Sequence, residues 1–133
     1  SVMFAILHLP MIIWGNTPAL LAAIWLFNLT LGGLMLGLAF VKAQTLWLSI
    51  GVHFSWNFVQ YHVVGIGGSG INSFYNLGAE LITGGVIGPE AGILGTVAFI
   101  LLILIVWLLP KEWIASTPLM NKTSQKRDFP NET

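Results

Sequence analysis

Four long hydrophobic runs, separated by short polar or glycine-rich breaks, dominate the first 110 residues. They cover residues 2–14, 19–41, 45–66 and 91–109. A helix needs about 20 apolar residues to cross a bilayer, and by this measure the last three runs qualify as spans. Backbone groups in lipid must be satisfied within their own segment, which favours helices over open strands. The pattern therefore predicts an all-α fold, a polytopic membrane bundle with about four hydrophobic helices.

The breaks predict how these helices are connected. Residues 15–18 form a Gly-Asn-Thr-Pro turn, and the link at residues 42–44 is so short that its two helices should be antiparallel neighbours. Residues 65–92 hold nine of the 15 glycines and predict a long irregular connection, in which residues 73–83 are a candidate interfacial helix. We expect residues 1–110 to be the membrane part and residues 111–133 a polar, disordered tail.

Composition and charge agree with this division. The chain is 56% hydrophobic and 8% charged, whereas a soluble domain carries roughly 25% charged residues. Seven of the ten charged residues lie between Lys111 and Glu132. The net charge of zero gives no reason to expect a nucleic acid partner, and there is no cysteine for disulfide or thiolate chemistry.

The positive charges predict the orientation in the membrane. Lys42 and the basic residues of the tail are separated by two expected spans, so they should lie on the same side of the bilayer. Basic residues favour the cytoplasmic side. We therefore expect a multi-pass protein of the cell membrane with a cytoplasmic C-terminus, and an outer position for the glycine-rich connection with Glu80 and Glu90.

The third hydrophobic run carries an ordered stripe of polar residues. Positions four apart share one face of a helix, so Ser49, His53 and Asn57 align, and Gln60 falls on the same stripe. His62 faces elsewhere. His53 lies about 13 Å into the bilayer at 1.5 Å per residue. Polar groups at that depth usually face a bundle interior or a cavity, although interhelical hydrogen bonds alone would also explain them.

The first run supplies a second histidine in a similar setting. Phe4 and His8 are four residues apart and share a helix face. Two histidines on separate helices, with an amide beside one of them, can converge on a single buried site. We expect the His8 and His53 side chains to approach each other across a cavity that they share with Asn57.

Other catalytic and cofactor sites find less support. The His-Glu-x-x-His string of zinc proteases is absent, and so is Gly-x-Ser-x-Gly. Ser55 points about 160° away from His53 on a helix. Residues 65–70 match Gly-x-Gly-x-x-Gly, but they follow a membrane helix and lack the strand–turn–helix context of a dinucleotide site. We expect no metal and no cofactor.

Two further patterns are interpreted without a catalytic role. Gly33 and Gly37 form a Gly-x-x-x-Gly motif, which predicts close helix packing within the bundle. Asn28-Leu29-Thr30 fits the glycosylation pattern but lies inside an expected span, where the modification does not occur.

The combination of Phe4-x-x-x-His8 and, one span later, His53-x-x-x-Asn57 resembles the CPBP family of intramembrane glutamic endopeptidases, which includes the CAAX prenyl proteases. The stretch "LTLGGLMLGLAFVKAQTLWLSIGVHFSWNF" is similar to the family's usual run between its later motifs, and "LITGGVIGPEAGILG" to the loop and last helix of bacterial members. The resemblance covers about residues 1–109. Each motif is weak alone, and their order and spacing are fairly specific. The resemblance implies a bundle of about eight membrane helices, of which this chain would hold four.

The resemblance also implies roles for the motif residues. A glutamate from a Glu-Glu-x-x-x-Arg motif would activate a water together with His8, while His53 and Asn57 would stabilise the oxyanion. This sequence contains no Glu-Glu pair. We therefore expect the motif upstream of Ser1 and no activity from this chain alone, because Glu80 and Glu90 would lie out of reach in the outer loop.

The implied activity is that of a metal-independent peptidase, a hydrolase. Its partners would be a peptide or membrane-protein substrate, the lipid bilayer and the upstream helices of the same protein. Because the surrounding sequence is bacterial in style, we do not expect a prenylated substrate. Two alternatives stay open: a non-catalytic membrane protein of the same fold, acting in bacteriocin immunity or partner binding, and an unrelated transporter or channel whose polar stripe lines a pathway.

Overall fold

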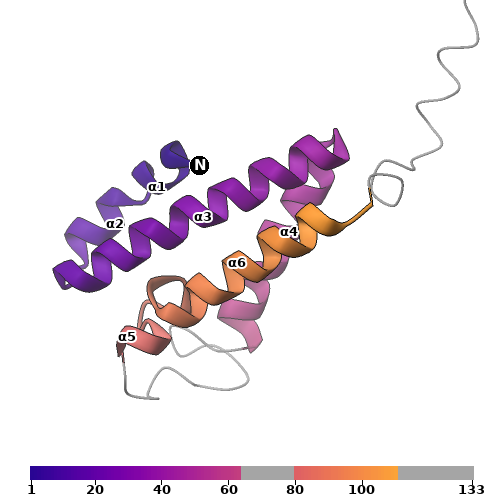
Figure 1. Cartoon of the computed structure of the whole chain (residues 1–133). Coiled ribbons are helices and arrows are strands. Elements are labelled where there is room, and N and C mark those ends of the chain that lie inside the picture. The colour runs from indigo at the N-terminus through magenta and orange to yellow at the C-terminus, as the bar shows by residue number, and fades with distance from the viewer. Residues whose placement is uncertain (64–79, 111–133) are drawn as a thin grey trace, which may run out of the picture.

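The computed structural model describes residues 1–63 and 80–110, and in these ranges the ordered elements are all helical (Figure 1). They are α1 (Val2–Ile6), α2 (Leu9–Trp14), α3 (Ala19–Ala43), α4 (Leu46–Phe58), the π-helical turn η1 (Val59–Val63), α5 (Glu80–Thr83), the 3₁₀ helix η4 (Pro89–Ala91) and α6 (Ile93–Leu108). The all-α prediction is confirmed for the described residues.

Helix α3 is the central element of the fold. It has 25 residues and packs against α1, α4 and α6. Among the described helices it is the one long and apolar enough to cross a bilayer. Helix α6 is strongly apolar but has 16 residues, and α4 has 13 before it continues into η1. The predicted hydrophobic runs therefore fold as helices, but the structure alone does not make each of them a span.

The first hydrophobic run is broken into two short helices, where the sequence pattern predicts one segment. Helix α1 ends at Ile6, and α2 begins at Leu9 with Pro10 in its first turn. Proline lacks an N–H group and has a fixed φ, so it suits the start of a helix rather than its interior. The break places His8 at the junction, in the N-cap position of α2 but without a side-chain cap hydrogen bond.

Helices α3 and α4 are joined by a very tight connection, in keeping with the short link in the sequence. Gln44 ends α3 in a left-handed conformation with φ of 54°, and α4 begins two residues later. The Ser49 hydroxyl donates to the Leu36 carbonyl at 2.9 Å. The Lys42 ammonium group donates to the carbonyls of Trp107 and Leu109, so the C-terminal ends of α3 and α6 lie together.

The start of α6 is fixed on α3 by a buried asparagine. Asn28 is fully buried, and its amide donates to the carbonyls of Glu90 at 2.8 Å and Gly92 at 2.9 Å. Its carbonyl accepts from the Thr96 hydroxyl at 2.7 Å. The sequence pattern gave Asn28 no role. In the structure it folds η4 back against the middle of the bundle.

Small residues of α3 allow close contacts with two other helices. A Cβ atom on Gly33 would lie 2.6 Å from Cα of Ser1, and one on Gly32 would lie 3.3 Å from the Phe99 ring. At Gly37 the same atom would meet nothing within 4 Å. The packing interpretation of the Gly-x-x-x-Gly motif is therefore right for Gly33 and wrong for Gly37, while Gly32 was overlooked.

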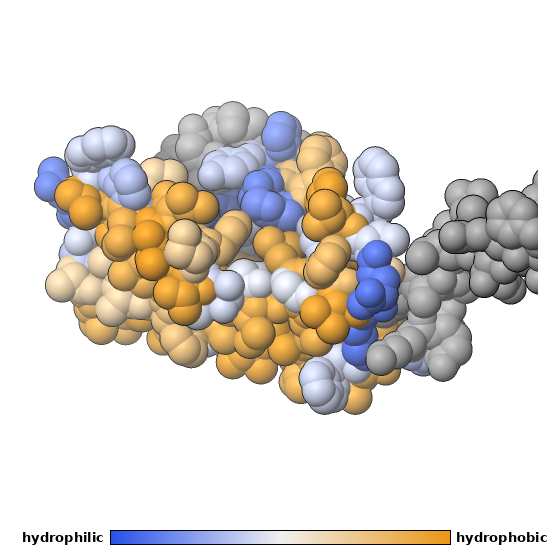
Figure 2. Space-filling model, turned by 90° about the horizontal axis from the view of Figure 1, so that it is seen from above, coloured by the Kyte–Doolittle hydropathy of each residue, from blue (hydrophilic) through white to orange (hydrophobic). Residues whose placement is uncertain are grey.

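Much of the outer surface is apolar, as Figure 2 shows for one face of the molecule. Large side chains stand exposed on α3, α4 and α6, among them Phe27, Trp47, Phe54, Leu101 and Trp107. Scattered exposed hydrophobic residues are normal on soluble proteins, but a continuous apolar surface requires a partner or lipid.

Three expectations fall wholly or partly outside the described residues. The helix expected at residues 73–83 is described only over α5, at Glu80–Thr83. The glycine pattern at residues 65–70 and the polar tail at residues 111–133 lie in the ranges that the structure does not describe.

Candidate functional site

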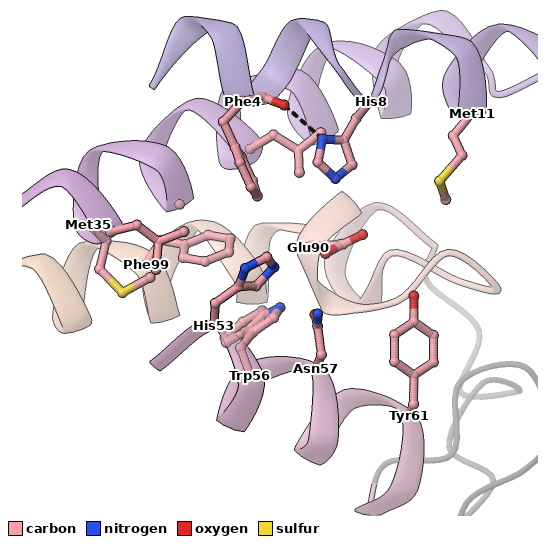
Figure 3. A pocket seen from close by; sticks show the side chains of 13 residues that line it. Phe4, His8, Met11, Met35, His53, Trp56, Asn57, Tyr61, Glu90 and Phe99 are labelled. Atoms are coloured by element: carbon pink, nitrogen blue, oxygen red, sulfur yellow. Dashed lines mark hydrogen bonds between the residues drawn. The ribbon is translucent and has the colours of Figure 1, made fainter. Parts of the chain in front are cut away.

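His8, His53 and Asn57 line one cavity of about 130 Å³ in the middle of the fold (Figure 3). The α1–α2 segment, α3, α4, η1, η4 and α6 all contribute to its wall. The lining residues are Phe4, His8, Met11, Leu29, Gly32, Met35, Leu36, His53, Trp56, Asn57, Tyr61, Glu90 and Phe99. The expected shared cavity is therefore present, and it brings together His8 and Asn57, which lie 49 positions apart in the sequence.

The orientation of the His8 ring is set by its own helix. Nδ1 of His8 lies 2.7 Å from the carbonyl oxygen of Phe4. A carbonyl oxygen only accepts, so in a neutral ring Nδ1 carries the proton and Nε2 has a free lone pair. This is the protonation state in which a histidine can accept a proton from water.

The Phe4 ring lies between the two histidines. Its centroid is 4.8 Å from that of His8 and 5.7 Å from that of His53, the second contact being edge-on. Helix α4 carries His53 and Asn57 one turn apart on its cavity face. Within the described residues the Asn57 amide has no hydrogen-bond partner, so its donors are available to a bound group.

Glu90 also lines this cavity, which corrects the expectation that it lies out of reach in an outer loop. Figure 3 shows its carboxyl group between His8 and Asn57. Trp25 Nε1 donates to Glu90 Oε1 at 3.2 Å. The prediction failed because residues 84–92 fold back onto α3, where Asn28 holds them.

The environment of the Glu90 carboxyl is dry but rich in donors. Burial raises the pKa of Glu90 above its ordinary value, and the Trp25 hydrogen bond and the nearby His8 oppose this rise. Desolvation disfavours the charged form, and donors favour it. Glu90 is therefore a titratable group inside the cavity rather than a surface charge.

Two further buried side chains near Glu90 have unused polar atoms. Trp56 Nε1 and both polar atoms of the Gln60 side chain are buried without a hydrogen-bond partner in the described part of the chain. Gln60 is only 2% exposed. Buried polar groups are generally paired, so such atoms indicate a place for water or a ligand.

Ser49 of the polar stripe, and Ser55 and His62 beside it, do not line this cavity. Ser49 donates to the backbone of α3, and the His62 ring stacks on Phe58 at 4.9 Å. Ser55 lines a separate apolar groove with Trp56 and Leu102. The interpretations of His62 and Ser55 as facing away from the site agree with this placement.

Sequence reasoning missed several wall residues, above all Glu90 and Trp25. A signal was present in the sequence, because Asn28 is an isolated amide in an apolar span and Glu90 directly precedes the last helix. Neither residue lies at a helical spacing from His8 or His53, so only the folded connection brings them together. Within residues 1–63 and 80–110, no three His, Cys, Asp or Glu side chains are grouped as a metal site requires.

One comparison with known proteins bears on this site. Residues 1–59 match the family model described as type II CAAX prenyl endopeptidase Rce1-like. The match spans α1 to α4 and includes His8, His53 and Asn57. No curated protein and no solved structure matches the chain.

Proposed function

We propose that this chain, which belongs to the CPBP family through residues 1–59, forms part of the active site of an intramembrane, metal-independent endopeptidase. The family is one of proteases. The observation that carries the proposal for this chain is the convergence of His8, His53 and Asn57, from separate helices, on one small cavity. The Rce1-like match covers all three residues.

The residues suit the two requirements of peptide hydrolysis. His8, with Nδ1 occupied by Phe4, accepts a proton from the attacking water at Nε2 as the new C–O bond forms. The His53 ring N–H and the Asn57 amide stabilise the oxyanion of the tetrahedral intermediate, an effect worth about 3–4 kcal/mol for one donor in comparable sites. The C–N bond then breaks, and the proton passes to the leaving nitrogen.

The glutamate of the proposed mechanism comes from an acidic motif that these 133 residues lack. We therefore place this chain as the C-terminal membrane part of a longer protein, inactive without upstream helices. Glu90 is the carboxyl group that this chain itself brings to the cavity. Cleavage by the chain alone would contradict the requirement for the upstream motif and point to Glu90 as the carboxyl group that activates the water together with His8.

The membrane setting is the second part of the proposal. Helix α3 is long enough to span, and the apolar α6 and the α4–η1 pair would lie beside it in lipid. The exposed apolar side chains of these helices support this environment. The protein would be multi-pass, with Lys42 and the C-terminus on the cytoplasmic side, and its substrate a peptide or a membrane protein.

Reconstitution of the full-length protein tests this function. In liposomes with a chelator present, it should cleave a membrane-inserted peptide into two fragments, one with a new free carboxylate. Loss of cleavage on addition of the chelator would contradict metal independence. Stable binding of a partner without any cleavage would favour the alternative, a non-catalytic protein of the same fold that acts in immunity or partner binding.

A further inference from the structure

A second cavity, of about 580 Å³, adjoins the first. Met11, Tyr61 and Glu90 line both cavities, so the two spaces meet at these side chains. The second cavity extends towards α5 and the turn at residues 84–87. A peptide bound at His8 and Asn57 would therefore have room for a neighbouring side chain on the far side of Glu90.

The chemistry of this second cavity is acidic and aromatic. Its wall contains the carboxyl groups of Glu80 and Glu90 and the rings of Trp25 and Tyr61, and among the described residues that line it there is no lysine, arginine or histidine. Aromatic faces and carboxylates together are the groups that attract ammonium and guanidinium ions. No cationic side chain of this described wall balances the two acids.

Acceptor positions at Glu90 and Gln60 are open to a ligand that donates hydrogen bonds. Trp25 supplies one hydrogen bond to the carboxylate, which has about four acceptor positions. Three atoms near this carboxyl are buried and unpaired within the described residues: one acceptor, the Gln60 carbonyl oxygen, and two donors, Gln60 Nε2 and Trp56 Nε1. A cation with several N–H groups would satisfy both acceptors, whereas an apolar side chain would satisfy neither.

We propose that the second cavity is a subsite for a lysine or arginine side chain of the substrate, next to the bond that is cleaved, with Glu90 as its counter-ion. The assignment rests on the proposed protease function, because it deepens that function by naming a substrate class. The carboxyl group is fixed for this task from two directions. Trp25 holds its oxygen, and Asn28 holds its backbone.

Because the two cavities share a wall, the basic side chain of the substrate must lie near the cleaved bond. Glu90 lines the cavity of His8, His53 and Asn57 and the acidic cavity at once. A substrate side chain that reaches Glu90 therefore belongs to a residue beside the reacting carbonyl. Burial raises the cost of the charged carboxylate, and an arriving cation lowers it, so cation and carboxylate stabilise each other.

Equilibrium binding to the full-length protein in detergent tests the subsite without requiring turnover. Two fluorescent peptides are compared that differ only in arginine or norleucine at the position beside the intended cleavage site. The arginine peptide should bind about tenfold more tightly or better at low salt, which corresponds to about 1.4 kcal/mol. Equal Kd values for the two peptides would overturn the proposal.

Substitutions of the two glutamates show which carboxyl group causes the preference for arginine. Glu90→Gln should reduce the arginine preference to less than about threefold, and Glu80→Gln, at an exposed position of the same wall, should reduce it less. Trp47 is 79% exposed on α4. Trp47→Phe is therefore the control for expression and purification of a variant, and it should leave the arginine preference intact. An unchanged preference in Glu90→Gln would contradict the role of Glu90.

The same peptides separate this inference from the proposed function. Cleavage of both peptides at equal rates would support the protease and overturn the subsite. An arginine preference in binding without cleavage of either peptide would support the subsite and contradict the protease.

Discussion

At the scale of single residues, Asn28 determines where the Glu90 carboxyl lies. It is buried in the middle of α3 and holds two backbone carbonyls and one hydroxyl from a distant part of the chain. Removing it would take away the amide donor of the Glu90 carbonyl, while the Gly92 carbonyl would still accept from the backbone N–H groups of Gly95 and Thr96. An unsatisfied buried group costs roughly 1–3 kcal/mol.

We predict that Asn28→Ala lowers the free energy of unfolding by about 1–3 kcal/mol. Thr30→Ala is the matched control, because the Thr30 hydroxyl bonds only to its own helix at the Leu26 carbonyl. That variant should change stability by less than about 0.5 kcal/mol. Denaturation of the purified protein in detergent measures both. Equal effects of the two substitutions would show that Asn28 does not hold η4.

A second prediction at this scale concerns pH. Burial raises the pKa of Glu90 from 4.5, so the folded state keeps a proton that the unfolded state has lost. The stability from this group is fully present below pH 4.5 and is lost as pH rises through the raised value. Glu90→Gln cannot ionise and should not show this part of the decline. The measurement is the unfolding midpoint of the unchanged protein and of Glu90→Gln at several values from about pH 4 to about pH 7. If the two proteins lose stability in parallel over this range, the prediction is wrong.

Single residues also show what the sequence could and could not predict. His8, His53 and Asn57 were predictable because spacing of four on an apolar helix assigns a face. Glu90 was not, because its position depends on a folded connection and on hydrogen bonds to α3. No periodicity records such contacts between residues 62 or more positions apart.

At the scale of elements, the site depends on how α6 begins. Helix α6 packs against α3 and η4, and its first turn lies directly on the backbone of η4. A Cβ atom on Gly95 would clash with the Pro89 carbonyl oxygen and lie 3.0 Å from Cα of Glu90. Glycine at this position lets η4 approach, and η4 carries Glu90 into the cavity.

We predict that Gly95→Ala destabilises the fold by about 1–3 kcal/mol, as overpacking generally does. Gly37→Ala is the matched control, because the added methyl group would meet nothing within 4 Å. Alanine is a better helix former than glycine by roughly 0.5–1 kcal/mol, so this variant should be neutral or slightly more stable. Thermal unfolding in detergent measures both variants. A stabilised Gly95→Ala protein would contradict the packing described for η4.

The sequence predicted the helices correctly where a hydrophobic run is long. It did not predict where a run is broken or changes its helix type. The run at residues 19–41 became α3, extended by two residues to Ala43. The run at residues 2–14 divides at His8 because Pro10 favours a new helix start. The third run ends in a π-helical turn that puts Gln60 in a buried position near Glu90, and polarity alone does not indicate such a turn.

At the scale of the whole molecule, the charges and the helix directions agree. The Asn28 contacts join the first half of α3 to the start of α6, and the Lys42 contacts join the ends of both helices. Helices α3 and α6 therefore run in the same direction. Helix α4, which lies between them in the sequence, runs antiparallel to α3. If these helices span the membrane, Lys42 and residue 110 lie on one side.

We predict that a reporter fused after Thr133 is active on the cytoplasmic side, because the basic tail and Lys42 favour that side. A reporter inserted after Thr83, close to α5, should report the outer side. The two fusions control for each other in expression and membrane insertion. Activity of the C-terminal fusion only outside the cytoplasm would invert the orientation proposed for the cavity.

The most direct test of the central claim is the rate of peptide cleavage by the full-length protein and its His53→Ala and Asn57→Ala variants. Each substitution should lower kcat by about two orders of magnitude or more, the usual loss for an oxyanion donor. Protein levels should change little, because interhelical hydrogen bonds in membranes average about 0.6 kcal/mol.

His62→Ala and Ser55→Ala are the matched controls, since both residues lie on the same helical segment outside the cavity. Both should keep nearly full activity. Full activity of His53→Ala and Asn57→Ala against a verified substrate would contradict the assignment of this cavity as the active site.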